Sequence, residues 1–518
     1  MTKQFTLQPG WLAVPFARAC AIVAAAALLA AGCAQIPADT DVLPQKDVAG
    51  AQLAANIKLA REGWPETQWW TRFGDAQLNQ LIAQALHEGP SLQVAAARVA
   101  TARATLALDS TNNGNDIDFK AATNRQRYSA NGLLPPPIGG SYYTESTLQL
   151  IFSHDFDWWG KRRALVAASV GELNARQADY AQAEQTLAAA IVQSYFSMQA
   201  DRGRLANLDQ LRRAQQALVT DKVRRIEHGL ATSDVQRTAE AELGATNRQY
   251  AVVEAHAARQ REALRALIGA GDQALAELVP HPLPDATGSL PPTLGIELLA
   301  RRPDLQAARA RVEASLSRIE ASKAAFYPDL NLTAFFGSDS LSLDKLLQAP
   351  SRTLFIGPTL TLPLFNSGSL QARLGVARST RNELIADYNQ SVFNAVRDVA
   401  QAGVDMQGLD KEAQAQAVST ASVLGNLRNT QARFARGLDD NSGVLDAQIG
   451  VLEQHDLDLQ LQAQRLLAEV ALIKALGGGY RSEPAASPLA ISSANMSMNA
   501  SQATGTNQPA AQQSKQPE

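Results

Sequence analysis

The sequence predicts a mainly α-helical protein with a small β part, built from two copies of one structural repeat. Two stretches, from Gly160 to about Gly269 and from Gly368 to about Gly477, follow the same course. Each opens after an aromatic segment, continues as a long run without proline, turns at a glycine and returns to a terminal glycine. The glycines of the two stretches share one offset of 208 residues. Chance rarely gives such agreement, so an internal duplication is predicted.

The length of the outgoing arms indicates helical rods. The arms run from Lys161 to His228 and from Ser369 to Arg436, and at 1.5 Å per residue each would be a helix of about 100 Å. Helices of globular proteins usually have about 8–20 residues. Apolar residues spaced three and four apart give the first arm a packing seam. The helices alone leave open a plain antiparallel coiled coil.

Residues 1–32 have the composition of a signal peptide. Lys3 and Arg18 form a weakly basic flank, and the run from Ala19 to Gly32 is almost purely apolar. A run of about 14 residues is too short to cross a membrane as a helix but suits secretion. It ends in LLAAGC, which resembles the cleavage box of bacterial lipoproteins. We therefore expect Cys33 to carry a covalent lipid, with N-acyl and S-diacylglycerol groups. An ordinary signal peptide with a cysteine near its cleavage site is the alternative.

The remainder of the chain divides into five segments. Residues 33–74 are expected to form a lipid-anchored N-terminal segment. Residues 75–279 and 295–480 are the two repeats, joined by a proline-containing linker at 280–294. The tail at 481–518 is rich in Ala, Ser, Gln and Asn with little charge, and we expect it to be disordered.

Each repeat carries a pair of candidate strands, at about 115–158 and about 328–366. Apolar and polar residues alternate in them, and a period of two over about ten residues is typical of transmembrane β-barrel strands. Two soluble hairpins are the alternative. The apolar members are Leu148, Leu150, Phe152, Phe156 and Trp158 in the first repeat, and Leu330, Leu332, Ala334, Phe336, Leu360, Leu362 and Leu364 in the second.

The number of strands limits the membrane interpretation. Four strands are too few for a barrel, because single-chain barrels begin at about eight strands. An open sheet edge cannot lie in lipid. If these strands cross a membrane, several chains must therefore share one barrel.

Composition and motifs argue against other functions. The net charge is −3 without a basic block, so nucleic acid is not an expected partner. The six histidines are scattered, with no spacing typical of a metal site. The sequence contains no glycine-rich phosphate loop and no GxSxG elbow. We therefore predict no catalysis, no metal and no cofactor besides the lipid.

The stretches WWTRFGDAQLNQLI, FDWWGKRRA, RRPDLQAA, LPLFNSG, RFARGL and ALGGG lie in a repeated order of helix, hairpin, long helix, tip and return helix. Together they resemble the outer membrane efflux proteins, the TolC-like outer membrane factors, in the lipoprotein branch that serves resistance–nodulation–division pumps. The resemblance spans Trp69 to about Tyr480. It implies a homotrimer in the bacterial outer membrane, with a shared twelve-stranded β-barrel and a long antiparallel α-helical barrel through the periplasm.

The same resemblance implies a function and partners. The protein would be the passive exit duct of a tripartite efflux pump for drugs or other toxic small molecules. Its partners would be a periplasmic adaptor (membrane fusion) protein, an inner-membrane resistance–nodulation–division pump and outer membrane lipid. A type I secretion duct for proteins and a structural periplasmic coiled-coil lipoprotein are the alternatives.

The helix tips contain the expected site residues. Gly229 and Gly437 mark turns where a left-handed residue is useful; with Arg225 and Arg436 they are the expected adaptor-docking tips. In the family, acidic residues just after the second tip narrow the periplasmic end, and the matching residue is Asp446. Three copies would form an acidic ring that attracts cations. Simple turns and a solvated helix carboxylate are the alternatives.

Overall fold

The computed structural model describes residues 36–46, 66–111, 114–271, 275–276, 278–285, 301–363 and 366–480. The predicted signal peptide, Cys33, the tail at 481–518 and most of the linker lie outside these ranges. The chain divides into two compact units. The first comprises Met1–Pro44, Ala102–Leu173 and Arg311–Ile385, and the second Gln45–Thr101, Asn174–Ala310 and Ala386–Glu518.

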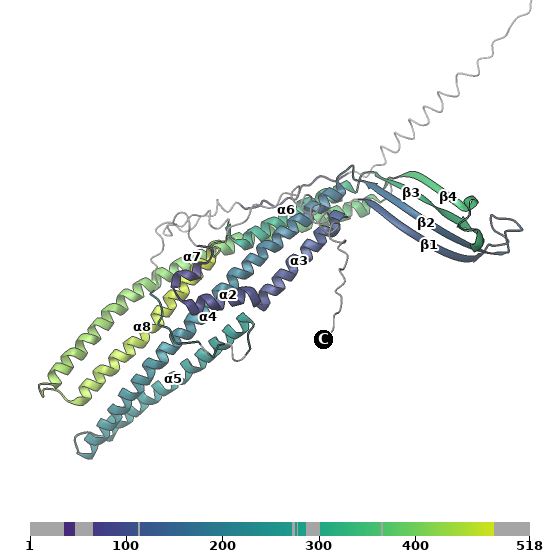
Figure 1. The fold of residues 1–518 in the computed structure, drawn as a ribbon. Helices are drawn as coiled ribbons and strands as arrows, with labels where there is room; N and C mark the ends of the chain where they lie inside the picture. Colours follow the sequence, from purple (N-terminus) through teal and green to yellow (C-terminus); the bar gives the residue numbers. More distant parts are fainter. Residues whose placement is uncertain are drawn as a thin grey trace, which may run out of the picture. The chain divides into compact units, whose positions relative to one another are not determined.

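The same order of elements occurs twice along the chain (Figure 1), so the internal duplication and the mainly helical fold class are confirmed. A 3-10 helix, η2 (Trp69–Phe73), and α2 (Ala76–Glu88) precede the first copy. The first copy consists of α3 (Pro90–Thr111), β1 (Asn115–Arg127), β2 (Tyr142–Phe156), α4 (Lys161–Glu227) and α5 (Ser233–Ile268). The second consists of α6 (Pro303–Ala324), β3 (Asp329–Ser340), β4 (Arg352–Thr361), α7 (Ser367–Phe434) and α8 (Asn441–Ala475).

The outgoing arms are single continuous helices, as predicted. α4 has 67 residues and α7 has 68, which corresponds to about 100 Å each. Both contain no proline and are rich in Ala, Gln, Leu and Arg, which are among the residues that favour helix most. The returning helices α5 and α8 are about half as long, with 36 and 35 residues. In the described ranges, no helix is both long and apolar enough to cross a membrane.

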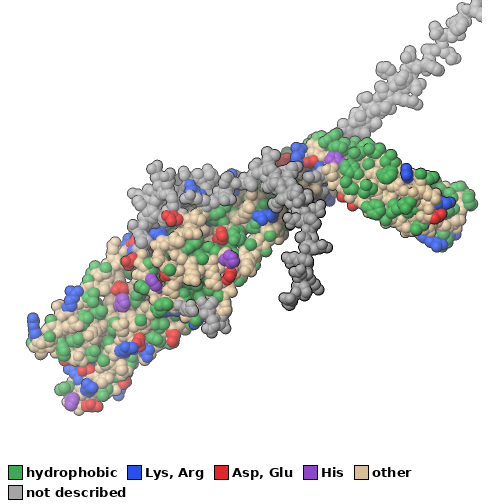
Figure 2. All heavy atoms as spheres, in the orientation of Figure 1, with side chains coloured by type: hydrophobic (Ala, Val, Ile, Leu, Met, Phe, Trp, Pro, Cys, Tyr) green, Lys and Arg blue, Asp and Glu red, His purple; other side chains and the backbone are tan. Residues whose placement is uncertain are grey.

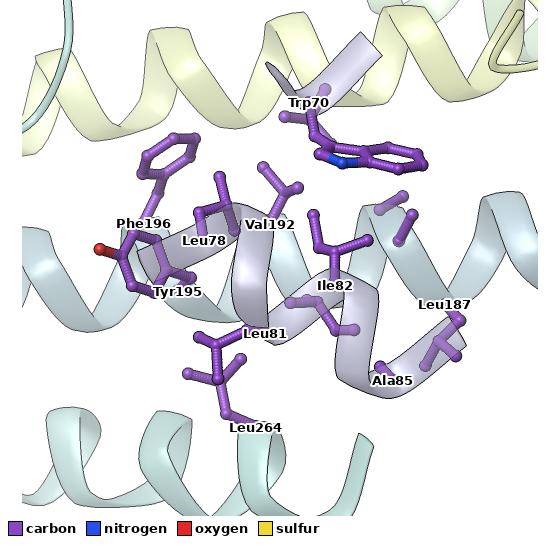
Figure 3. Packing of buried hydrophobic residues seen from close by; sticks show 14 of the residues in the cluster. Trp70, Leu78, Leu81, Ile82, Ala85, Leu187, Val192, Tyr195, Phe196 and Leu264 are labelled. Atoms are coloured by element: carbon purple, nitrogen blue, oxygen red, sulfur yellow. The ribbon is translucent and has the colours of Figure 1, made fainter. Parts of the chain in front are cut away.

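The largest apolar cluster holds α2 against the long helices of the second unit (Figure 3). Asp75 begins α2, because its carboxylate accepts a hydrogen bond from the Leu78 amide at 3.1 Å. The Asp75 carboxylate also accepts a 2.7 Å hydrogen bond from the buried Tyr195 hydroxyl of α4. The apolar face that α2 presents to this cluster is buried: Leu78, Leu81, Ile82 and Ala85.

The first unit contains one antiparallel sheet with the order β1-β2-β3-β4. β2 and β3 lie where the alternation predicts them, except that Trp158 lies two residues beyond the end of β2, and β1 lies within the range expected for the first pair of strands. The fourth was predicted too late: alternation of Leu360 and Leu362 suggested a strand beyond Thr361, but β4 ends at Thr361. Pro363 follows closely and has no amide hydrogen to donate to a neighbouring strand. Leu364, the last member of the predicted alternation, lies outside the described residues.

Candidate functional site

The register of the sheet sorts its side chains onto an apolar and a polar face. Directly opposed residues in an antiparallel pair share a face, and Leu150 opposes both Phe119 and Phe336. Figure 2 shows hydrophobic side chains gathered over the sheet. The apolar face comprises Ile117, Phe119 and Ala121 of β1, Leu148, Leu150, Phe152 and Phe156 of β2, Leu330, Leu332, Ala334 and Phe336 of β3, and Leu354, Ile356, Pro358 and Leu360 of β4.

The apolar face is exposed like a membrane-facing surface and approaches the height of one. From Phe156 to Leu148 the band extends about 27 Å along the strand, and a tilt of about 40° reduces this to about 20 Å of membrane thickness. The apolar band of outer-membrane barrels is about 25 Å tall. Phe119 is 70% exposed and Leu354 is 78% exposed in the single chain. A continuous exposed apolar surface of this kind indicates contact with lipid or protein.

Aromatic side chains border the band where β2 ends and β3 begins. The indole of Trp159 donates a 2.8 Å hydrogen bond to the Pro328 carbonyl oxygen. Its ring stacks on Tyr327, with ring centroids 4.4 Å apart and planes inclined by 15°. The adjacent Trp158 is exposed. Trp and Tyr are enriched at membrane–water interfaces, so this end of the sheet has the aromatic border of membrane-spanning strands.

The outer strands leave the sheet incomplete. β1 and β4 are the first and last strands in its order, so within the described chain each has one side without a partner strand. Backbone amide and carbonyl groups on such edges cannot be left unpaired in lipid. Another copy of the same sheet would supply the missing strand at each edge.

The two helix tips have the same backbone structure. Gly229 and Gly437 have φ angles of +67° and +69°, as the glycine pattern predicted. In each tip the amide after the glycine donates to the carbonyl five residues earlier, from Leu230 to Arg225 at 2.8 Å and from Leu438 to Arg433 at 2.9 Å. This is the Schellman arrangement, which requires a left-handed residue. Both leucines are more than two-thirds exposed, at 72% and 70%.

A polar network joins the end of α4 to the start of α8. Arg225 forms an ion pair with Asp440 and donates a 3.3 Å hydrogen bond to the Ser442 hydroxyl. The Ser442 hydroxyl donates to the Asp221 carboxylate at 2.6 Å and accepts from the Lys222 ammonium at 3.2 Å. Asp440 also begins α8, because it accepts from the Gly443 amide at 2.9 Å. The corresponding residue before α5, Thr232, makes no side-chain cap.

Asp446 lies one turn beyond this network on α8 and is exposed. Partial burial raises the pKa of its carboxyl group, the nearby Lys222 ammonium opposes this, and the Asp440 and Asp221 carboxylates add to it. The pKa of Asp440 is instead lowered, first by the Gly443 amide and then by Arg225. The second tip therefore carries two carboxylates whose affinities for a proton are shifted in opposite directions.

The structure gathers most of the predicted site residues at the tips. Arg225, Gly229, Arg436 and Gly437 lie at the two turns, and Arg436 is exposed. Their adaptor-docking role stays a prediction, as does the role of Asp446. Sequence reasoning missed Asp221, Lys222, Asp440 and Ser442. These residues are about 220 positions apart between the two arms, so no local pattern could join them.

The described N-terminal segment follows one side of α7. The guanidinium of Arg378 donates to the carbonyl oxygens of Pro37 and Ala38 at 2.7 and 2.9 Å. The buried Arg381 forms an ion pair with Asp39. Ile36 packs near Leu370 at the start of α7. Ile36, three residues after Cys33, therefore lies close to the end of the sheet, because α7 follows β4 in the chain.

Two of the sequence stretches that carry the family resemblance meet at Arg302. Its guanidinium pairs with the Asp304 carboxylate at 2.8 Å and with the Asp398 carboxylate of α7 at 3.4 Å. It also donates to the Ala475 carbonyl oxygen at 2.9 Å, at the end of α8. The backbone of Gly477, with a φ of +89°, approaches Arg302 closely. Arg302, in the stretch RRPDLQAA, therefore connects three places: the glycine-rich end of α8, the start of α6 and the middle of α7.

Comparison with known proteins agrees with this geometry. The profile of the family "Outer membrane efflux protein" matches residues 81–270 and 294–478, so each copy of the repeated order is matched once. The multidrug resistance outer membrane protein MdtP of Escherichia coli is 38% identical over 475 residues, covering 90% of this chain and 97% of MdtP. The putative multidrug resistance outer membrane protein MdtQ of Shigella flexneri is 37% identical, covering 88% of this chain and 96% of MdtQ.

A solved structure shares the fold. The outer membrane protein VceC of Vibrio cholerae matches with a TM-score of 0.73 and 29% identity, covering 81% of this chain and all of VceC. The matches cover both repeats, the sheet with its apolar face and the long helices. The chain therefore belongs to the outer membrane efflux protein family and is an outer membrane protein.

Proposed function

We propose that three copies of this chain form the exit duct of a tripartite efflux pump, with a shared transmembrane β-barrel and a helical tunnel in the periplasm. The observation that carries this proposal is the four-stranded sheet, which has one apolar face and two edges without a partner strand. An eight-stranded barrel from two copies would be filled by its own side chains. Three copies give twelve strands and leave room for a lumen.

The tips support a role at the periplasmic end of the duct. Gly229 and Gly437 end two helices of about 100 Å, and each is followed by an exposed leucine. Exposed apolar residues next to Arg225 and Arg436 suit a protein partner, and we assign that partner as the periplasmic adaptor. The adaptor would connect the duct to an inner-membrane resistance–nodulation–division pump, which supplies the energy.

Cys33 is proposed to carry N-acyl and S-diacylglycerol groups. A single acyl chain holds a protein to a membrane only weakly, and a second contact makes the attachment stable. The contacts of Pro37, Ala38 and Asp39 with α7 would keep the lipid near the sheet. Replacing Cys33 with Ser should abolish incorporation of labelled palmitate, while incorporation into Cys33→Ser at the wild-type level would show that lipid attaches elsewhere.

The cargo is proposed from the relatives. MdtP and MdtQ are named as multidrug resistance proteins, and we assign drugs or other toxic small molecules to this duct. Proteins of this family are ducts rather than enzymes. Cargo would therefore pass through the lumen without chemical change.

Single-channel conductance in planar bilayers tests the duct directly. Detergent-extracted wild type should run as an oligomer and give a small conductance that prefers cations. Asp446→Ala should raise the conductance or lower the cation preference, because three carboxylates would be removed from the constriction. Asp344→Ala, in the loop between β3 and β4, makes the same charge change elsewhere and should leave the current unaltered.

The outcomes separate the parts of the proposal. Conductance that is equal in wild type and Asp446→Ala would keep the duct but remove Asp446 from its constriction. Folded protein with neither an oligomer nor a conductance would overturn the duct itself.

A further inference from the structure

The charged residues of the sheet are divided between its two faces. The polar face carries six carboxylates and one lysine, whereas the apolar face carries three arginines and His154, whose ring forms a hydrogen bond with the Asn115 side chain. A surface in contact only with water has no need to separate charges in this way. The polar face contains Asp116, Asp118, Lys120, Glu145, Asp155, Asp329 and Asp339, and the apolar face contains Arg125, Arg127 and Arg352.

The three arginines lie at one end of the apolar band. Arg352 opposes Ser338 in the row of Ala121 and Leu148, where the band ends. Arg125 and Arg127 follow four and six residues after Ala121 on β1. This is the end of the sheet at which the loops join β1 to β2 and β3 to β4. The opposite end carries the tryptophans and passes into the helices.

None of these arginines forms an ion pair within the described residues. The Arg125 guanidinium lies 5.7 Å from the centre of the Tyr142 ring, and Arg127 Nε donates to the Gly140 carbonyl oxygen at 3.2 Å. All three side chains are exposed. By contrast, arginines elsewhere in the chain, such as Arg204 and Arg302, pair with carboxylates. The guanidinium groups at this end of the band therefore have donors available for an external anion.

The proposed assembly brings the arginines together. β1 and β4 are the two outer strands of the sheet, so closing the barrel sets β1 of one copy beside β4 of the next. Arg125 and Arg127 would then share a seam with Arg352 of the partner subunit. Adjacent strands are about 4.8 Å apart, a distance at which long arginine side chains can reach one ligand.

We propose that this arginine cluster binds the phosphate groups of lipopolysaccharide in the outer leaflet, an inference that rests on the proposed barrel. The helices leave the other end of the sheet for the periplasm, so the loop end lies at the outer leaflet. The cluster faces outward just beyond the apolar band, which is the level of the lipid headgroups. Guanidinium groups bind phosphate oxygens with two parallel hydrogen bonds, and this geometry favours arginine over lysine.

Lipopolysaccharide retention by detergent-extracted oligomer tests the proposal. Wild type, Arg125→Gln and Arg352→Gln would be incubated with radiolabelled lipopolysaccharide, and the amount that co-elutes with the oligomer would be measured. Each substitution should lower the apparent affinity about fivefold, the usual effect of one basic residue near an anionic lipid surface. Lys120→Gln lies on the same strand as Arg125 but on the polar face, so it should bind like wild type.

Competition identifies the source of the phosphate. Unlabelled lipopolysaccharide should displace the label, and inorganic phosphate at the same phosphate concentration should not. Equal loss in Arg125→Gln and Lys120→Gln, or equal displacement by phosphatidylglycerol vesicles, would overturn the assignment. The oligomer is checked on the same column. Loss of the oligomer in wild type would count against the proposed duct, whereas an intact oligomer that retains no lipopolysaccharide would count against this inference alone.

Discussion

A single glycine determines the shape of each helix tip. Gly437 has a φ of +69°, and no atom lies within 4 Å of the position that a Cβ would occupy. The cost of Gly437→Ala is therefore a backbone cost of about 1–2 kcal/mol. Gly425, within α7, also has free space around it but helical backbone, so Gly425→Ala should stabilise the helix by up to about 1 kcal/mol. Hydrogen exchange of the tip amides should become faster in Gly437→Ala and not in Gly425→Ala.

The shifts at Asp446 and Asp440 predict how the second tip responds to acid. The pKa of Asp446 is raised by partial burial, so it gains a proton at a higher pH than an ordinary aspartate, whose pKa is about 3.9. Ionisation of Asp446 therefore opposes the folded state, and this effect disappears as the pH falls through its raised pKa. The pKa of Asp440 is lowered, so its cap and ion pair persist to a lower pH.

Cation preference of the channel should follow Asp446. As the pH falls, the preference should decrease with a midpoint above 3.9, while the tip remains folded because Asp440 is still ionised. Asp446→Asn should have a low preference at every pH. A midpoint below that of an ordinary aspartate, or an unchanged titration in Asp446→Asn, would assign the preference to other carboxylates.

For single residues, the sequence predicts the backbone conformation of the tips better than it predicts which side chains form pairs. Gly229 and Gly437 could be placed from their position between two long proline-free runs, because a helix that reverses needs a left-handed residue. The pairing of Arg225 with Asp440 could not be predicted in this way, because the two residues are 215 positions apart. Sequence spacing reports contacts within one element, whereas this contact exists only after two arms of different repeats pack together.

At the scale of the elements, the side chain of Arg302 holds the C-terminal end of α8 in place. The guanidinium pairs with two carboxylates and the Ala475 carbonyl while it is only 9% exposed. Burial lowers the pKa of Arg302, but the Asp304 and Asp398 carboxylates outweigh this effect and raise the pKa above its ordinary value. Arg302→Met would leave Asp304 and Asp398 without this cation. Breaking a fully buried pair costs about 3–5 kcal/mol. Because Asp304 and Asp398 are 31% and 34% exposed and Asp398 keeps its pair with Arg397, the loss here should be smaller than that.

Unfolding in urea, monitored by the helical circular dichroism signal, would measure this loss. Arg436→Met removes the same charge at an exposed tip position and should shift the midpoint little. Similar midpoints for the two variants would mean that Arg302 does not hold α8.

The elements themselves were largely predictable. The proline-free runs predicted both ends of α4 and of α7 to within three residues. High helix propensity over such a length leaves no competing structure. The alternation predicted the apolar faces of β2 and β3, whereas Ile117, Phe119 and Ala121 of β1 could be assigned to that face only from the pairing with β2. β4 was placed too late because leucines continue to alternate past its end, and alternation does not reveal where backbone pairing stops. The apolar Ile36 could not be linked to α7 from sequence, since the two lie more than 300 residues apart.

For the whole molecule, the open edges of the sheet make the strongest prediction. Asn124→Cys in β1 and Thr353→Cys in β4 lie on the polar face of the two outer strands. In the proposed barrel, β1 of one copy lies about 4.8 Å from β4 of the next. A bismaleimide of about 10 Å reach should therefore convert the double variant into covalent dimers and trimers in denaturing gels, with no larger species, because the ring closes after three copies.

The central strands provide the matched control for the same reagent. Thr147 and Asp339 are directly opposed in β2 and β3 of one chain, so cysteines at these positions should cross-link internally and leave the protein at monomer size. Wild type, whose Cys33 thiol would be occupied by lipid, should not react. A ladder that continues beyond three copies would indicate an open array of sheets. Such an array leaves strand edges unpaired at its ends, which lipid does not tolerate, so a limit at three would be direct evidence that these sheets close into one barrel.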